Sequence, residues 1–275
     1  MDQNERLDYL IEQFKNESPK YRSLYIPEDR EGKQRTLRAL MNVRMPKILP
    51  ASALAVQDAY LQERSRENGI VNVADIPTIA ALGSRHSFGD RISLWQGDIT
   101  RLAADAIVNA ANSGMLGCFV PNHKCIDNCI HTFAGIQLRA ECSRRMERLR
   151  EEFGPDYEQP TAVPMLTDGY NLPARKVIHI VGPIVEEQLT SEHEELLAEC
   201  YRSCLDLAAE NGLKSVAFCG ISTGVFHFPA HRAAAIAVQT VTDWLGSHPS
   251  VIDRVIFNVF GDEARRIYEQ ELLGS

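Results

Sequence analysis

The sequence lacks any long apolar run and any export signal. No segment approaches the roughly 20 apolar residues that a membrane-spanning helix needs. The first residues, MDQNERLDYLIEQF, are polar and periodic, whereas a secretory signal has a basic start and an apolar stretch. We therefore expect a cytoplasmic protein with no membrane partner.

The sequence also lacks the marks of a disulfide scaffold and of a nucleic-acid-binding protein. It has 7 cysteines in 275 residues, and an odd number in a long chain without an export signal favours reduced thiols, some of which could bind metal. The net charge is −8, whereas binding along a nucleic acid depends on Lys and Arg. A small anion stays possible, because backbone N–H groups and a helix N-terminus can hold a pyrophosphate.

The first part of the chain is predicted to be helical. Apolar residues recur at helical spacing in two places, and a third helix is expected over about 51–66. The residues that carry the first two patterns are Leu7, Leu10, Ile11, Phe14, Leu37, Leu40 and Met41. A linker near 83–89 would divide the chain into an N-terminal helical extension, 1–89, and a main domain, 90–275.

From Arg91 onward, short apolar runs alternate with helical stretches. Strands are predicted at 92–95, 106–108, 177–181, 215–219 and 255–260, and helices over about 130–152, 192–211 and 229–246. Such alternation predicts an α/β fold with a largely parallel sheet. Ligands bind beyond the carboxyl ends of such strands, so the loops after Val108, Cys219 and Phe260 are the places to expect a site.

Three segments that follow predicted strands have unusual chemistry, and each also has an ordinary explanation. Asp98 in Gln96–Thr100 could bind a ligand or cap a helix. Asn109 and Asn112 follow a buried strand and could contact sugar hydroxyls or form a turn. The run Cys219–Phe226, rich in Gly, Ser and Thr, could bind phosphate or be a simple turn.

Taken together, these segments resemble the successive signatures of macrodomains. The matching segments are QGDIT at 96–100, AIVNAAN at 106–112, GYNLPA at 169–174 with VIHIVGP at 177–183, and ISTGVF at 221–226. The resemblance spans roughly 90–270 and implies a three-layer α/β/α domain, with a mixed, largely parallel sheet, that binds ADP-ribose. It implies that Asp98 accepts from the adenine amino group with Ile99 beside it, and that Asn112 meets the distal ribose. It also implies that the diphosphate is wrapped by Ser222, Thr223, Gly224, Val225 and Phe226, with Phe260 near the adenine end.

The loop after the asparagine pair departs from the pattern of metal-free macrodomain hydrolases, which have a run of glycines there. Instead, Cys118, His123 and Cys125 form a Cys-x4-His-x-Cys run, and thiolate with imidazole favours Zn²⁺. Three ligands would leave a position open for catalysis, whereas Cys129 could complete a closed, structural site. The run resembles the zinc-containing macrodomain subclass, which supports three ligands and one Zn²⁺ per chain.

Two further residues next to this run are candidates for a role in the site. By the resemblance, Asp127 falls where hydrolytic macrodomains place an acidic residue that contacts the distal ribose and its water. It is the candidate general base, although it could also cap the following helix. His131 is expected to be a structural donor, with a direct role in the chemistry as the alternative. His227 and His231 flank the Cys219–Phe226 loop, and surface histidines of an aromatic-rich turn explain them equally well.

The predicted function is zinc-dependent removal of mono-ADP-ribose from modified protein side chains, most plausibly Asp or Glu esters. Two alternatives stay open: a module that binds ADP-ribose without turnover, and a hydrolase of small esters such as O-acetyl-ADP-ribose. A zinc deaminase is disfavoured because its His-x-Glu and Pro-Cys-x-x-Cys signature is missing. The subclass resemblance also implies a link to a sirtuin-type ADP-ribosyltransferase and a lipoyl-carrier substrate related to glycine cleavage H.

Overall fold

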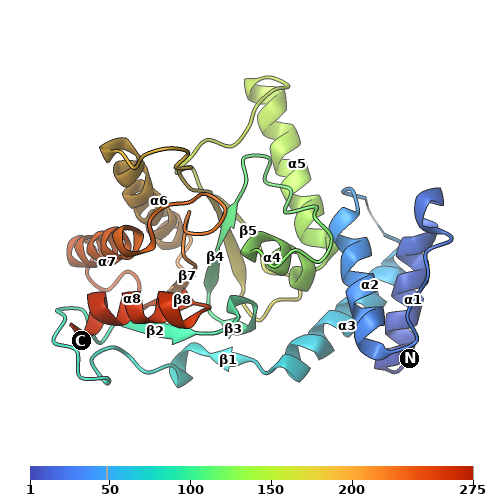
Figure 1. The fold of residues 1–275 in the computed structure, drawn as a ribbon, viewed down its shortest axis with the longest axis horizontal. Coiled ribbons are helices and arrows are strands. Elements are labelled where there is room, and N and C mark those ends of the chain that lie inside the picture. The colour runs from blue at the N-terminus through green and yellow to red at the C-terminus, as the bar shows by residue number, and fades with distance from the viewer. Residues whose placement is uncertain (48, 275) are drawn as a thin grey trace. The chain divides into compact units, whose positions relative to one another are not determined.

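A computed structural model describes residues 1–47 and 49–274 of the chain (Figure 1). The chain forms two compact units that do not follow its order. We call the first the helical unit; it consists of Met1–Gly69, Leu116–Tyr157 and Tyr170–Leu172. The second, the sheet unit, consists of Ile70–Met115, Glu158–Gly169 and Pro173–Ser275.

The helical unit contains the three helices predicted for the N-terminal region. They are α1 (Gln3–Asn16), α2 (Arg30–Val43) and α3 (Ala51–Asn68), and a short 3-10 helix, η1, covers Pro19–Tyr21. Asp2 and Asp29 begin α1 and α2, because each carboxylate accepts from backbone N–H groups of the first turn. The apolar residues predicted from helical spacing are buried in one cluster that also contains Tyr60, Leu61 and Ile136.

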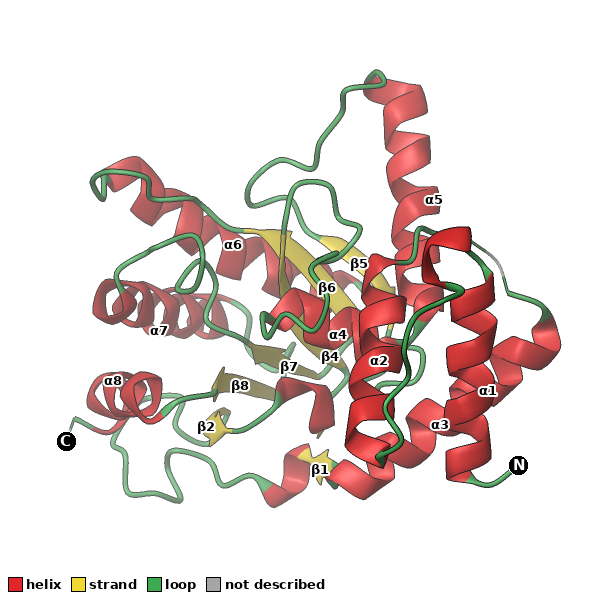
Figure 2. Cartoon of the chain, turned by 45° about the vertical axis from the view of Figure 1, so that its right-hand side comes forward, coloured by secondary structure: helices red, strands yellow, loops and turns green. Residues whose placement is uncertain are grey.

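The other two helices of this unit were predicted as one. The structure has α4 (Ile126–Ala134) and α5 (Ile136–Phe153), drawn as separate helices in Figure 2. Gly135 lies between them with a φ of 94°, which a residue with a side chain rarely adopts and which no α-helix contains. The predicted single helix is therefore wrong at this point, and α4 also begins earlier than predicted.

The sheet unit is built on a six-stranded sheet in the order β2-β8-β7-β4-β6-β5. All neighbours are parallel except β5 and β6, which are antiparallel. The strands are β2 (Ile92–Gln96), β4 (Ala106–Ala111), β5 (Met165–Asp168), β6 (Lys176–Val181), β7 (Ser215–Phe218) and β8 (Arg254–Val259). A separate parallel pair consists of β1 (Val71–Asn72) and β3 (Leu102–Ala103).

Three helices belong to this unit: α6 (Ser191–Glu210), α7 (Ala230–Ser247) and α8 (Asp262–Leu273). Two 3-10 helices, η2 (Val73–Asp75) and η3 (Ile99–Arg101), complete it. The five predicted strands and the helices α6 and α7 are confirmed, whereas β5 and α8 were not predicted. The α/β fold with a mixed, largely parallel sheet and an N-terminal helical region is confirmed; the division of the chain at 89/90 stays a prediction.

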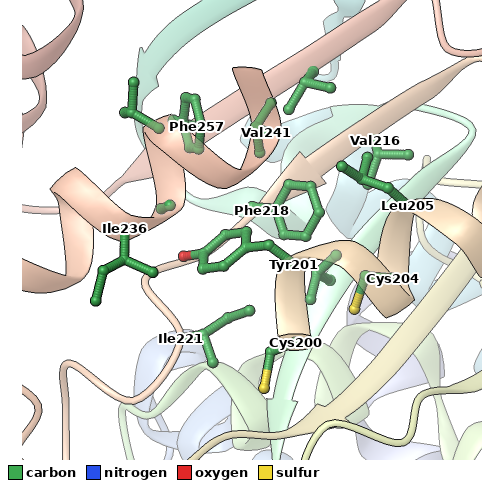
Figure 3. Packing of buried hydrophobic residues seen from close by; sticks show 14 of the residues in the cluster. Cys200, Tyr201, Cys204, Leu205, Val216, Phe218, Ile221, Ile236, Val241 and Phe257 are labelled. Atoms are coloured by element: carbon green, nitrogen blue, oxygen red, sulfur yellow. The ribbon is translucent and has the colours of Figure 1, made fainter. Parts of the chain in front are cut away.

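The core of the sheet unit lies between the sheet and these helices (Figure 3). Tyr201 from α6 packs against Phe218 at the end of β7, with 4.9 Å between the ring centroids. Both rings are almost completely buried. Burying rings of this size removes much apolar surface from water, which fixes α6 on the sheet and holds the end of β7 in place.

Within the described residues, no helix is long and apolar enough to cross a membrane.

Candidate functional site

Four neighbouring parallel strands end at one edge of the sheet, and a segment singled out from the sequence follows each of them. The strands are β2, β8, β7 and β4, in that order. Parallel strands bring their carboxyl ends to the same edge, where ligands of open α/β sheets bind. We call this edge, with the residues that follow each strand, the strand-end site.

At the end of β2, Asp98 caps a short helix with one of its carboxylate oxygens, Oδ1. Its Oδ1 accepts from Thr100 N at 3.0 Å and from Thr100 Oγ1 at 2.7 Å, which starts η3. Both hydrogen bonds use the same oxygen. Ile99 beside it is buried, with an exposed fraction of 1%. The capping role is thus confirmed.

At the end of β7, the loop before α7 has the features of an anion-binding turn. Ser222 has a φ of 63°. Across the described part of the chain, no protein acceptor takes the N–H groups of Thr223 through Phe226. The turn closes through Phe228 N, which donates to Ser222 O at 3.0 Å, and His227 N, which donates to Gly224 O at 3.1 Å. Consecutive N–H groups of this kind can cradle a phosphate.

The side chain of Ser222 is buried within this loop. It is 4% exposed, and its hydroxyl has no hydrogen-bond partner among the residues that the structure describes. Gly182, just after β6, lies against it so closely that a Cβ there would stand 2.1 Å from Ser222 Oγ. A buried hydroxyl without a protein partner is costly, which favours a polar ligand next to it.

At the end of β4, the structure separates the two asparagines. Asn109 is inside the strand and fully buried, and its Nδ2 lies 3.0 Å from His179 Nδ1. His179 Nε2 in turn lies 3.0 Å from Thr167 Oγ1, so Asn109 belongs to a polar network within the sheet. Asn112 follows the strand and is exposed, and its Oδ1 accepts from Gly114 N at 3.1 Å. Asn112 is therefore the asparagine at the strand-end site.

Phe260 directly follows β8 and has an exposed fraction of 82%. A large aromatic ring that is this exposed, between the ends of β2 and β7, offers a flat apolar surface to a ligand. His227 and His231 are exposed as well.

The predicted metal ligands come together within the helical unit. The ligand atoms of Cys118, His123 and Cys125 all lie within 4.8 Å of one another, and Cys118 Sγ is 3.5 Å from His123 Nδ1. All three side chains are half-buried. Two sulfurs and one imidazole are a donor set that suits Zn²⁺, so the residues fit this ion.

The surroundings of Cys125 shift the pKa of its thiol, and a bound cation would shift it in turn. Burial is the main cause that raises the pKa of Cys125 to about 12, and the charges of Cys118 and Asp127 act in the same direction. A bound divalent cation acts in the opposite direction, because it stabilises the thiolate. Cys129 does not belong to the cluster; its sulfur lies 3.4 Å from Nη2 of Arg38. The geometry therefore fits three ligands better than four.

Asp127 lies in the first turn of α4 and is 4% exposed. The N-cap of this helix is Cys125, whose sulfur accepts from Asn128 N at 3.4 Å. The alternative that Asp127 caps the helix is therefore wrong. Its Oδ1 lies 3.5 Å from Nε2 of His131, one turn later on the same helix. The two form a buried acid–imidazole pair.

The sequence interpretation missed the residues that hold the loop of the candidate metal ligands, from Leu116 to Cys125, which we call the metal loop. Arg139 of α5 is 5% exposed, and its guanidinium lies 4.2 Å from the ring centroid of Phe119. It donates to Leu116 O at 2.7 Å and to Cys118 O at 3.4 Å in the loop, and to Arg44 O at 2.6 Å. No sequence pattern marks such a contact, because an arginine in a polar helix is most often a solvated surface residue.

Comparison with known proteins agrees with this fold. The model of the Macro domain family matches residues 108–237. A protein of Treponema medium named protein-ADP-ribose hydrolase is 48% identical over 270 residues, which cover 98% of this chain and 99% of that protein. A protein of the same name from Staphylococcus aureus (strain MRSA252) is 42% identical, with 96% and 94% covered.

Solved structures show the same likeness. A Trypanosoma brucei macrodomain in complex with ADP-ribose has a TM-score of 0.64 and 30% identity, covering 85% of this chain and 94% of that one. An Oceanobacillus iheyensis macrodomain with ADP has a TM-score of 0.58 and 37% identity, covering 68% and 92%. Relatives this similar over nearly the whole chain establish the relationship. The chain belongs to the macrodomain family.

Proposed function

We propose that this macrodomain is a zinc-dependent protein-ADP-ribose hydrolase that removes mono-ADP-ribose from modified Asp or Glu side chains. The observation that carries the proposal is the cluster of Cys118, His123 and Cys125, in a chain that resembles proteins named protein-ADP-ribose hydrolase along its whole length. A binding module would need no such group of ligands.

The order of the strand-end site supports ADP-ribose as the ligand. Along the sheet edge, Asp98 and Ile99 follow β2, Phe260 follows β8, the loop from Ser222 follows β7, and Asn112 follows β4. Acceptor and aromatic ring suit adenine, consecutive N–H groups suit a diphosphate, and an amide suits ribose hydroxyls. This is also the order of adenine, diphosphate and distal ribose along the ligand.

In this proposal each candidate residue has a separate role in binding or catalysis. Cys118, His123 and Cys125 would hold Zn²⁺, which would supply the Lewis acidity that polarises an oxygen or activates water at neutral pH. Asp127 accepts a proton from the attacking water, whose oxygen bonds to C1″ of the distal ribose while the bond from C1″ to the Asp or Glu carboxylate oxygen breaks and that carboxylate leaves. His131 lies beside Asp127. Asn112 orients the distal ribose, and the loop from Ser222 to Phe226 fixes the diphosphate, so that binding energy positions the scissile bond.

The test is release of ADP-ribose from a protein modified on Asp or Glu, with metal analysis of the same preparation. The wild type should contain one Zn²⁺ per chain, lose turnover with a chelator and regain it with added Zn²⁺. Asp127→Asn and Cys118→Ala should lose turnover by about a hundredfold or more while they keep ADP-ribose affinity. Cys129→Ser is the matched control and should keep both metal and turnover.

Other outcomes would replace the proposal. ADP-ribose binding without turnover in the wild type would identify a reader module. Cleavage of O-acetyl-ADP-ribose but not of modified protein would identify a small-ester hydrolase. Full turnover with no metal present would remove zinc from the mechanism. The lipoyl-carrier substrate and the sirtuin-type transferase are proposed on the family resemblance alone, and such a carrier protein is the first modified substrate to try.

A further inference from the structure

Two side chains of α2 contact the loop that carries the metal-binding histidine. Arg38 and Asn42 are one turn apart, so they lie on the same face of the helix. Nη2 of Arg38 donates to His123 O at 2.7 Å. Oδ1 of Asn42 accepts from Asn122 N at 2.9 Å. The bonded residues are 85 and 80 positions apart in the sequence but belong to the same compact unit.

These two hydrogen bonds hold the backbone on both sides of His123. One fixes the N–H of the preceding residue, Asn122, and the other fixes the carbonyl of His123 itself. Asn122 has a φ of 55°, an uncommon conformation for a residue with a side chain, although Asn adopts it more readily than most. External contacts are therefore needed to keep the turn that directs the imidazole toward Cys118 and Cys125.

The same two residues also bind α4, which begins at the third metal ligand. Arg38 Nη2 donates to Asn128 Oδ1 at 2.8 Å, and Asn42 Nδ2 donates to Thr132 Oγ1 at 3.0 Å. Asn128 completes the connection, because its Nδ2 donates to Val120 O at 2.9 Å. The hydrogen bonds thus form a closed network from α2 to the loop and to α4.

Burial makes this network rigid. Asn42 is 1% exposed and Asn128 is fully buried, while Arg38 is half-buried. Hydrogen bonds shielded from water are stronger than exposed ones, and breaking one leaves a buried polar group unsatisfied. A loop held this way keeps its ligand positions before any metal binds.

We propose that Arg38 and Asn42 are positioning residues of the metal site, which makes α2 of the N-terminal helical region an integral part of that site. This inference rests on the proposed zinc function. Residues behind metal ligands commonly change metal affinity by about tenfold to a hundredfold, because they hold the ligands in place. Without them, the loop would lose conformational entropy when the ion binds, and this loss would lower the Zn²⁺ affinity.

The experiment measures the affinity of the full chain for Zn²⁺ by competition with a chromophoric chelator, and the absorption spectrum with Co²⁺ in its place. Asn42→Ala and Arg38→Ala should each lower Zn²⁺ affinity by about tenfold or more and change the Co²⁺ spectrum. Arg38→Lys should fall between Arg38→Ala and the wild type, because an ammonium can still reach one acceptor.

Two control variants separate positioning from general stability. Arg35→Ala changes an exposed arginine on α2 that pairs with Glu31, and should leave the affinity unchanged. Leu10→Ala removes a fully buried side chain from the apolar core of the helical unit and takes part in none of these hydrogen bonds, so its melting temperature should fall while Zn²⁺ affinity stays near wild type.

Each outcome supports or overturns the proposal. If the wild type binds Zn²⁺ and the Arg38 and Asn42 variants bind it equally well, the positioning role is wrong but the proposed function stands. If Leu10→Ala loses as much affinity as Asn42→Ala, the effect is one of folding, and the positioning role is again wrong. If the wild type binds no Zn²⁺, the proposed function and this inference fail together.

Discussion

At the scale of single residues, Gly182 is the position where a minimal change tests the strand-end site. A methyl group there would stand 2.1 Å from Ser222 Oγ and 2.7 Å from Ile221 Cγ2, both in buried side chains. These side chains must therefore move, and the loop from Ser222 to Phe226 would move with them. Gly182→Ala should cost about 1–3 kcal/mol of stability, as overpacked sites do, and should lower ADP-ribose affinity by about tenfold.

Calorimetric titration with ADP-ribose, together with thermal unfolding, measures both effects. Gly246→Ala is the control, because a methyl group there meets its nearest neighbour, Phe88, at an ordinary 3.5 Å. Unchanged affinity in Gly182→Ala would mean that the loop around Ser222 does not contact the ligand.

Candidate ligands with unusual chemistry could be found from the sequence, whereas the residues that hold them in place could not. Cys118, His123 and Cys125 are close together in the chain, and their chemistry is unusual enough to be noticed. Arg38 and Asn42 are ordinary residues in a polar helix, and their partners are far away in the sequence. Only the tertiary fold reveals that they contact the metal loop.

At the scale of elements, Asp105 connects the starts of two strands. It directly precedes β4, and its Oδ2 accepts from the backbone of Lys214 at 2.8 Å and from that of Ser215, where β7 begins, at 3.1 Å. Burial would raise the pKa of Asp105, but these bonds and the ion pair with Arg175 outweigh it, so the pKa is lowered. The carboxylate therefore stabilises the sheet where it is ionised.

The sign of the pH dependence follows from the lowered pKa. The stabilisation by Asp105 is complete above its ordinary pKa of about 4, and it is lost as the pH falls through the lower value of the folded state. Asp105→Asn should thus be less stable than the wild type at pH 7, and the difference should narrow in acid. Urea unfolding across this range checks it, with exposed Asp243→Asn as control; a constant difference at all pH values would contradict the prediction.

Element prediction from the sequence succeeded where the apolar pattern was strong. The five strands with apolar runs were found, whereas β5 was missed because its four residues, MLTD, carry only a short alternation. Helix α8 has three buried residues among many charges, which weakens its pattern. The break at Gly135 was missed because a glycine inside a helical pattern often leaves the helix intact, and only its positive φ shows the interruption.

At the scale of the whole molecule, net charge and ligand charge have the same sign. The protein has a net charge of −8, and ADP-ribose is an anion. The loop from Ser222 to Phe226 contains no Lys or Arg, so local N–H groups have to provide the attraction. Salt screens long-range charge far more than short contacts, so raising NaCl from about 0.05 to 0.5 M should not weaken ADP-ribose binding.

Titration of the metal-free protein with ADP-ribose at several salt concentrations measures this dependence. A constant or slightly rising affinity is expected, because salt also screens the repulsion between protein and ligand. A loss of tenfold or more would show that Lys or Arg side chains outside the strand-end site carry the binding.

The strand order of the sheet has a consequence for ligand size. Neighbouring strands stand about 4.8 Å apart, so β2 and β4, three steps from each other, are separated by roughly 14 Å in the row where all four strands pair. Main-chain hydrogen bonds set this spacing, although β4 pairs with β7 only at Ala106 and Ile107. On the proposed assignment, a dinucleotide-like molecule spans from the residues after β2 to those after β4, whereas a shorter one with a single phosphate would leave one of the two outer strand ends empty.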